Sequence, residues 1–349
     1  MVSRLEKIGY SARQSARVAW YMGHYFASQR YHKAKDEADV RREKPKAPGP
    51  TAERLLNDLA AVFARDLANV EAGHYPMPRD RDEPPLERLR RSRKYFADLP
   101  VAAERKQERR GDEVYSAELK EKLPAYFLQN FHYQTGGYLT EESAELYDLQ
   151  VDVLFSGSTN AMRRQCLVPL AEFMRGKDQR KVKVADIACG TGRFLDAVKQ
   201  AYPRIRAVAS DLSEAYLAEA EDYLEQWSGI EFAPANAETL PFEDNSFDVA
   251  TCIYLFHEVP PKVRRIIAAE FARILKPGGR LIFMDSLQMG DLPGYDGVLQ
   301  SFPLNFHEPF YGSYTKEDLP AIFTDAGLTH VRSEPVFLSK MVVCDKPRP

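Results

Sequence analysis

A chain of 349 residues exceeds the usual size of a single-domain core, so the length predicts one catalytic domain with an added region. The composition, with 44% hydrophobic and 28% charged residues, is that of an ordinary soluble globular protein and excludes a fully disordered chain. The net charge of −3 argues against bulk binding to nucleic acid.

The spacing of the cysteines and the composition of the first residues indicate the cellular compartment. Four cysteines lie far apart, without a C-x-x-C pair or clustered histidine partners, so the sequence predicts free thiols and no metal site. The first residues lack the apolar core of a signal peptide, and no apolar run reaches the roughly 18 residues that a membrane span needs. We therefore expect a cytoplasmic protein without a transmembrane segment.

The first part of the chain reads as helical and basic. Apolar residues recur at helical spacing over 3–40, a K-P-K-A-P-G-P segment interrupts them, and a second helix is expected over 51–72 with Thr51 as its N-cap. A proline-rich loop over 75–85 follows. Residues 1–110 hold 24 Lys/Arg against 16 Asp/Glu, and the segment 86–111 is the most basic. That segment is either a solvated helix face or a surface that binds anions.

The segment 123–158 is crowded with aromatic residues around Gly136 and Gly137. Such a segment, placed just ahead of a cofactor domain, either caps the active site or packs the helical region onto the core. Helices are expected over 143–155 and 160–175, and Pro169 should kink or break the second. We place the domain boundary here, with a helical region over 1–142 and the catalytic domain over 143–349.

The centre of the chain is the stretch K-V-K-V-A-D-I-A-C-G-T-G-R-F-L-D over 181–196, a strand, a tight turn and a helix start. Glycine lets a ligand approach the main chain, and the free N–H groups of the helix favour an anion. A dinucleotide site would carry a third glycine where Leu195 stands. The D-I-A-C-G-T-G sequence instead resembles the first motif of the class I S-adenosylmethionine-dependent methyltransferases.

The order of the following elements supports this resemblance. The strand R-A-V-A-S-D ends at Asp211, about twenty residues beyond the glycine turn, where such folds place a carboxylate for ribose hydroxyls. Ser213 is the expected N-cap of the next helix. Further strands are expected at 230–234, 247–253, 280–285, 329–335 and 337–344, and the segments A-N-A-E-T-L-P-F and L-K-P-G-G-R-L resemble later motifs of the family. Alternating strands and helices predict an α/β fold, a doubly wound, Rossmann-like, seven-stranded methyltransferase sheet with a helical N-terminal extension.

The resemblance covers residue 181 to the C-terminus and is greatest to the group that includes the ubiquinone/menaquinone-biosynthesis C-methyltransferases. It implies S-adenosyl-L-methionine as the cofactor, with glycines cradling its methionine part, Asp186 holding the ammonium, Asp211 the ribose, and Asn236 with Ala237 the adenine. Asn236 stands where an aspartate is common in the family. The full set of implied cofactor residues is Asp186, Ala188, Cys189, Gly190, Gly192, Asp211, Leu212, Asn236, Ala237 and Tyr254.

A general base would help if the acceptor is a hydroxyl or an enolisable carbon. His257, just past the fourth strand of the domain, is one candidate, and His307 within N-F-H-E-P-F-Y is its rival. Either histidine can equally be a packing residue. The candidates for an apolar substrate pocket, whose alternative role is ordinary packing, are Tyr133, Tyr138, Phe302, Phe306, Phe310, Tyr311 and Tyr314.

Three interpretations of the function remain open at this point. The first is a methyltransferase that acts on oxygen or carbon of an apolar or aromatic small molecule. The second is a protein or RNA methyltransferase recruited through the basic N-terminal region. The third is a binding protein that retains the fold without catalysis. The chain carries Ile253-Tyr254-Leu255-Phe256 instead of the [N/D]-P-P-[Y/F] of amino-methylating nucleic-acid enzymes, which weakens a base-methylation reading.

Overall fold

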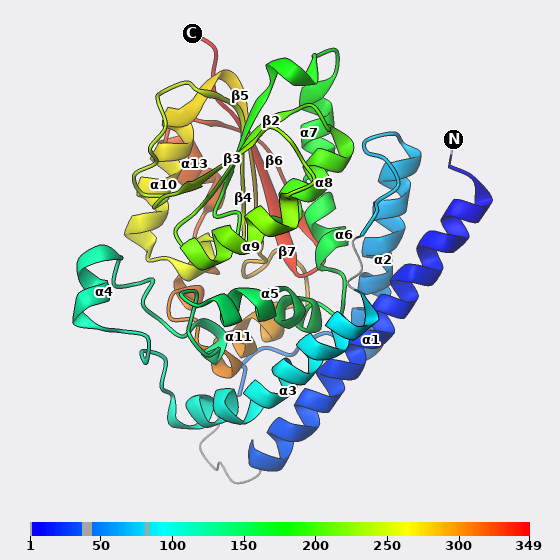
Figure 1. Cartoon of the computed structure of the whole chain (residues 1–349), viewed down its shortest axis with the longest axis vertical. Helices are drawn as coiled ribbons and strands as arrows, with labels where there is room; N and C mark the ends of the chain where they lie inside the picture. The colour runs from blue at the N-terminus through cyan, green and yellow to red at the C-terminus, as the bar shows by residue number, and fades with distance from the viewer. Residues whose placement is uncertain (1, 37–43, 81–83) are drawn as a thin grey trace.

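The computed structural model describes residues 2–36, 44–80 and 84–349. Two sequence predictions extend beyond these ranges. The end of the expected helix over 3–40 and part of the expected loop over 75–85 lie outside the described residues. The remainder forms an α/β domain against which the N-terminal helices pack (Figure 1).

Seven strands form one sheet in the order β3-β2-β1-β4-β5-β7-β6. Strands β1 to β5 pair in parallel, whereas β7 runs antiparallel to both β5 and β6. The predicted doubly wound, seven-stranded fold is therefore confirmed. The strands are β1 Lys183–Ile187, β2 Arg206–Asp211, β3 Ile230–Pro234, β4 Phe247–Ile253, β5 Leu275–Ser286, β6 Thr329–Val336 and β7 Ser339–Asp345.

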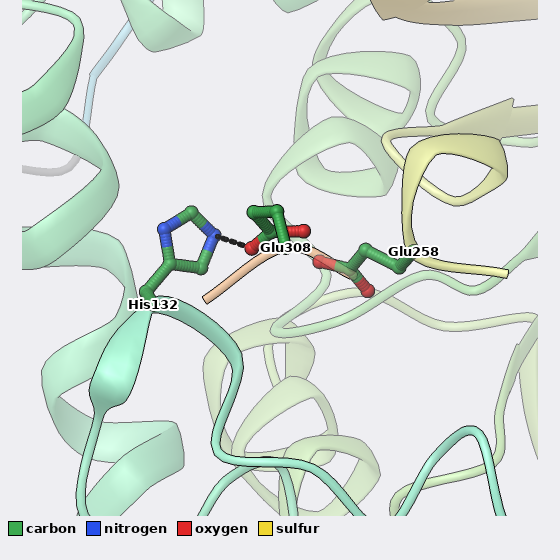
Figure 2. A group of neighbouring side chains, drawn as sticks. All are labelled: His132, Glu258 and Glu308. Atoms are coloured by element: carbon green, nitrogen blue, oxygen red, sulfur yellow. Dashed lines mark ion pairs between the residues drawn. The ribbon is translucent and has the colours of Figure 1, made fainter. Parts of the chain in front are cut away.

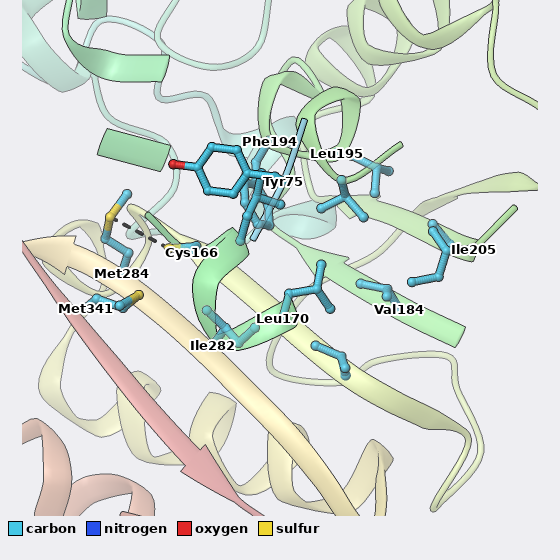
Figure 3. Close-up of a cluster of buried hydrophobic side chains, with 14 of the residues drawn as sticks. Tyr75, Cys166, Leu170, Val184, Phe194, Leu195, Ile205, Ile282, Met284 and Met341 are labelled. Atoms are coloured by element: carbon cyan, nitrogen blue, oxygen red, sulfur yellow. Dashed lines mark hydrogen bonds between the residues drawn. The ribbon is translucent and has the colours of Figure 1, made fainter. Parts of the chain in front are cut away.

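Side chains that alternate along each strand build a core on both faces of the sheet. On one face Val184 of β1 packs with Leu170, Phe194 and Leu195 (Figure 3). On the other face Ala185 and Ile187 of β1 pack with helices that follow later in the chain. The first face is covered by α6 Thr159–Arg164, α7 Leu167–Met174, α8 Arg193–Ala201 and α9 Glu214–Leu224, and the second by α10 Pro261–Ile274 and α13 Leu319–Asp325.

The N-terminal region consists of α1 Arg4–Asp36, α2 Ala52–Glu71 and α3 Pro85–Glu108. Thr51 caps α2 as predicted, because its side chain accepts a hydrogen bond from the N–H of Arg54. The buried Asp66 carboxylate of α2 accepts hydrogen bonds from Arg164 of α6 at 2.7 Å and from Tyr10 of α1 at 2.5 Å. The ring of Tyr75 belongs to the core of the sheet (Figure 3). These contacts join the region before residue 142 to the domain that follows it, and the predicted boundary stays a prediction.

The basic segment over 86–111 corresponds to α3, and much of its charge is paired within the chain. Arg90 and Lys94 both form ion pairs with Glu145 of α5, which spans Glu141–Leu154. Arg91 approaches Glu219 of α9 at 3.4 Å. The basic side chains therefore attach α3 to the catalytic domain.

One segment differs from the sequence prediction. The single helix expected over 160–175 is split into α6 and α7 around Gln165, before Pro169, which lies in the first turn of α7 where its missing N–H costs no hydrogen bond. The loop after β5 contains α11 Asp296–Asn305 and α12 Tyr311–Tyr314. The remaining elements are α4 Ala117–Lys122 and three short 3₁₀ helices at Phe131–Tyr133, Gln179–Lys181 and Phe256–Glu258. Within the described ranges, no helix has both the length and the apolar character needed to cross a membrane.

Candidate active site

The turn between β1 and α8 places main chain at the edge of a cavity. Ala188, Gly190 and Gly192 have φ angles of 54°, 55° and 76°, in the left-handed region that favours glycine. A Cβ atom on Gly192 would lie 2.7 Å from the Cδ1 atom of Leu224 on α9, so this position favours glycine through both its φ angle and its packing. A Cβ atom on Gly190 would meet no described atom within 4 Å. Gly190 thus leaves its main chain open to a ligand.

Asp186, at the end of β1, carries an unsatisfied oxygen below this turn. One carboxylate oxygen accepts a 2.6 Å hydrogen bond from the hydroxyl of Thr251 on β4. The other, Oδ2, is buried and has no hydrogen-bond partner among the described residues. Burial raises the pKa of Asp186 to about 7, although the bond from Thr251 acts to lower it. A cationic group of a ligand would satisfy this oxygen.

Asp211, at the end of β2, is held against the same turn. Its carboxylate accepts hydrogen bonds from the N–H of Gly190 at 2.8 Å and from the N–H of Ser213 at 2.9 Å. Burial raises its pKa, and these N–H groups lower it. Ser213 caps α9 as predicted, accepting from the N–H of Tyr216 at 3.2 Å. The carboxylate is therefore fixed in orientation beside the glycine turn.

Asn236 and Ala237 follow β3 and form the next part of the wall. The Asn236 amide oxygen accepts from the N–H of Glu238 at 2.9 Å, and its NH₂ group donates to the Glu238 carboxylate at 3.3 Å. The same carboxylate accepts a 2.6 Å bond from the hydroxyl of Tyr126. The loop after β3 is thereby linked to the aromatic segment that precedes the domain.

These elements surround one cavity with a volume of ≈ 770 Å³ including its opening to solvent. Seven of the ten predicted cofactor residues line it, and Asp186, Cys189 and Gly192 lie outside the lining. The seven are Ala188, Gly190, Asp211, Leu212, Asn236, Ala237 and Tyr254.

Aromatic side chains form the wall that faces the glycine turn. Tyr138 of the segment before α5, Tyr147 of α5 and Tyr216 of α9 pack edge to face, with ring centroids 5.2–6.1 Å apart. The Tyr138 hydroxyl donates a 2.5 Å hydrogen bond to Glu258, a carboxyl whose pKa burial raises to about 7. The aromatic lining residues are Tyr126, Phe127, Phe131, Tyr138, Tyr147, Tyr216 and Tyr254, and the acidic ones are Asp211 and Glu258. The segment 123–158 thus supplies most of the aromatic side chains of this wall, and several of the same rings pack together with Tyr216 in a buried cluster.

Comparison with known proteins bears on this arrangement. The family described as "Methyltransferase domain" matches residues 184–279. A demethylmenaquinone methyltransferase of Thermotoga maritima is 31% identical over 183 residues, which cover 52% of this chain and 75% of that protein. This chain belongs to the class I S-adenosylmethionine-dependent methyltransferases. S-adenosylmethionine is the cofactor of that family.

Two further matches cover smaller parts of this chain. The ubiquinone/menaquinone biosynthesis C-methyltransferase UbiE of Desulfotalea psychrophila is 32% identical over 140 residues, or 40% of this chain and 53% of that protein. The methyltransferase described here therefore spans about half the length of that relative. A crystal structure of a SAM-dependent methyltransferase from Aquifex aeolicus covers 51% of this chain and 87% of its own, at 20% identity and a TM-score of 0.38.

Asp285, at the end of β5, fixes the ring of His257 in this methyltransferase. The Nδ1 atom of His257 lies 2.5 Å from the Asp285 carboxylate. Burial alone would lower the pKa of His257, but the charge and hydrogen bond of Asp285 raise it to about 10. His257 is not among the residues that line the cavity, and its role as a general base stays a prediction.

His307 and most of the predicted pocket residues lie outside the lining of the cavity. The His307 ring packs against Gly111, and its Nε2 lies 2.8 Å from the amide oxygen of Gln129. Tyr314 is buried and donates to the carbonyl of Ser286 at 2.6 Å. Of the seven predicted substrate residues only Tyr138 lines the cavity; the others are Tyr133, Phe302, Phe306, Phe310, Tyr311 and Tyr314.

Sequence reasoning did not select two residues of the wall, Tyr216 and Glu258. Tyr216 occupies an apolar position of α9 and has the pattern of a core residue. Glu258 directly follows His257, and the histidine is the more usual candidate for a general base. The available signal was position, because Glu258 lies just after the carboxyl end of β4, where open α/β sheets bind their ligands.

Proposed function

We propose that this methyltransferase transfers a methyl group from S-adenosylmethionine to an oxygen or carbon atom of an apolar or aromatic small molecule. The observation that carries the proposal is the single cavity in which the glycine turn faces a wall of tyrosine and phenylalanine rings. Aromatic walls favour flat apolar ligands.

The cofactor would be held by the groups that the structure leaves available. The unpartnered oxygen of Asp186 would take the ammonium of the methionine part, beside the open main chain at Gly190. The carboxylate of Asp211 would take the ribose hydroxyls. Asn236 and Ala237 would meet the adenine, with the Asn236 side chain already oriented by Glu238. These residues fit the cofactor, because each offers the polar group that the matching part of it needs.

Methyl transfer requires little of the protein beyond the positioning of the cofactor and the acceptor. Bound S-adenosylmethionine supplies a methyl group on a positively charged sulfur, which becomes neutral when an acceptor atom takes the methyl group in line. The buried tyrosines exclude water and hold the acceptor ring. Burial raises the pKa of Tyr138 and Tyr216 well above the ordinary value, so both hydroxyls stay protonated. The Tyr138 hydroxyl donates to Glu258 and the Tyr216 hydroxyl lies 2.9 Å from that of Ser143, so these residues would meet the acceptor through their ring faces and edges.

The names of the relatives support an aromatic acceptor. They include a C-methyltransferase of ubiquinone and menaquinone biosynthesis and a demethylmenaquinone methyltransferase. A quinol-like ring would suit the aromatic wall of the cavity, and this chemistry is the substrate class that we favour.

A transfer assay with labelled S-adenosylmethionine tests the proposal. The protein is incubated with a panel of quinols and hydroxylated aromatic compounds, and separately with extracts divided into lipid, small polar and macromolecular fractions. We expect label in a quinol or in the lipid or small-molecule fraction, and none with Asp211→Ala. Label confined to protein or RNA, or no label although the cofactor binds, would refute the proposal.

A further inference from the structure

Three chain segments bring a histidine and two glutamates together beside the cavity (Figure 2). His132 comes from the 3₁₀ helix before α5, Glu258 from the 3₁₀ helix after β4, and Glu308 from the segment before α12. One nitrogen of His132 and one carboxylate oxygen of each glutamate all lie within 4.8 Å of one another. His132 Nε2 is 3.2 Å from Glu308 Oε1. We call these three residues the His-Glu-Glu cluster.

Glu308 is the member of the cluster whose polar atoms lack partners. The side chain has no exposed surface, and neither carboxylate oxygen has a hydrogen-bond partner in the described part of the chain. In Figure 2 this carboxylate lies between His132 and Glu258. Burying a carboxylate without hydrogen bonds or a counter-charge is costly, so such a group is normally paired or bound to a metal. The structure places it where a cation would contact all three side chains.

The backbone holds His132 in an unfavourable conformation to present its ring. His132 and the next residue, Tyr133, have φ angles of 54° and 59°, in the left-handed region that non-glycine residues rarely adopt. The N–H of His132 donates to the carbonyl of His307 at 3.3 Å, which ties this turn to the chain that carries Glu308. Strain of this kind persists where the surroundings fix it, commonly at ligand-binding sites.

The donor set selects the kind of ion. Imidazole nitrogen suits zinc and other transition metals, and carboxylate oxygen also suits manganese. Neighbouring ligands around an ion at about 2.1 Å lie about 3.0–3.4 Å apart, and the His132–Glu308 separation of 3.2 Å fits this spacing. The three ligand atoms together lie within 4.8 Å of one another, so binding of an ion would draw the Glu258 carboxylate closer to the other two. We propose that His132, Glu258 and Glu308 bind one divalent transition-metal cation of the Mn²⁺ or Zn²⁺ class. Its two positive charges would neutralise the two carboxylates.

The place of Glu258 gives this ion a role in the proposed reaction. Glu258 both belongs to the His-Glu-Glu cluster and lines the cavity, and Tyr138 holds one of its oxygens in place. Three protein ligands leave coordination positions open, as in metal sites that also bind substrate. An acceptor oxygen in the cavity would take one of them and be oriented there, a consequence that rests on the proposed methyl transfer.

Metal titration of the whole protein tests the inference. After dialysis against a chelator, binding of Mn²⁺ and Zn²⁺ is measured by calorimetry for the wild type, Glu308→Gln and His132→Gln. The matched controls are Glu221→Gln on the exposed side of α9 and His330→Gln on β6. We expect one ion per chain, bound roughly 100-fold more weakly by the two cluster variants and unchanged in the controls. Millimolar binding to the wild type, or equal binding by all variants, would overturn the inference.

Two further measurements keep the result decisive. Pulsed electron paramagnetic resonance of the wild type with Mn²⁺ should show coupling to a histidine nitrogen, which is retained in His330→Gln; absence of this coupling would overturn the site even if the cluster variants fail to fold. Binding of S-adenosylhomocysteine is measured in the same samples. If this product binds and the metal does not, the metal site is wrong and the proposed function stands; the reverse result leaves the metal site standing and removes the proposed function.

Discussion

Replacement of Asp186 by asparagine is expected to stabilise the cofactor-free protein at high pH and to weaken its binding of the cofactor. The folded protein raises the pKa of this carboxyl from 3.8 to about 7 through burial. The folded state therefore holds a proton that the unfolded state has released between these values, and stability falls as pH rises through that window. A shift of about 3 units at 1.36 kcal/mol each is about 4 kcal/mol above pH 7, of which roughly 3 kcal/mol develops between pH 5 and pH 8.

Urea unfolding of the cofactor-free protein at pH 5 and pH 8 measures this effect. The unfolding free energy of Asp186→Asn minus that of the wild type should rise by roughly 3 kcal/mol between the two pH values. The control Asp196→Asn alters a buried carboxylate that Gln200 and Trp227 already satisfy at 2.7 Å, so the difference there should not rise in this way. Asp186→Asn should also bind S-adenosylhomocysteine more weakly but 5′-methylthioadenosine, which lacks the ammonium, equally well. A pH-independent difference, or equal losses for both ligands, would refute the reasoning.

Three other variants separate packing from binding. Gly192→Ala should lower the free energy of unfolding in urea by about 1–3 kcal/mol, because its new Cβ would lie 2.7 Å from Leu224 of α9. Gly190→Ala should lower this free energy less, but it should weaken cofactor binding, measured by calorimetry, more than Gly192→Ala does. Asp211→Ala should weaken the binding of S-adenosylhomocysteine by about tenfold or more, since hydrogen bonds to a charged group contribute about 1.5–3 kcal/mol. Phe127→Ala should raise the acceptor KM in the transfer assay with unchanged cofactor affinity, and Phe306→Ala, outside the cavity lining, should not; equal effects of the two phenylalanines would contradict the placement of the acceptor.

The sheet was predictable because its signals are local. The strand Arg206–Asp211 has the bounds that its apolar run and terminal acid predict, and Thr51 and Ser213 cap helices as their types suggest. The split between α6 and α7 was not, because Pro169 suits either a kink within one helix or the first turn of another. The choice depends on packing against the sheet, which no single segment encodes.

The place of Gly190 and Asp211 in the cavity lining was predictable for the same reason, since they belong to short segments with fixed spacing. The other groups of side chains were not, because they combine distant segments. His132 and Glu308 meet across 176 residues, and the role of His257 depends on Asp285 of another strand, 2.5 Å away. The position of His257 in the sequence suggests a general base, but the state of its ring depends on the Asp285 carboxylate beside it.

The packing of α3 weighs against recruitment of a macromolecule through the basic N-terminal region. Arg90 and Lys94 are paired with Glu145, and Arg105 is buried and paired with Glu113. A phosphate would have to displace these carboxylates, so the count of basic residues overstates the positive charge that a nucleic acid would meet. The chain that follows α3 carries the aromatic residues over 126–138 that line the cavity. The basic helix therefore anchors the aromatic wall to the catalytic domain, which favours a small acceptor enclosed between the two.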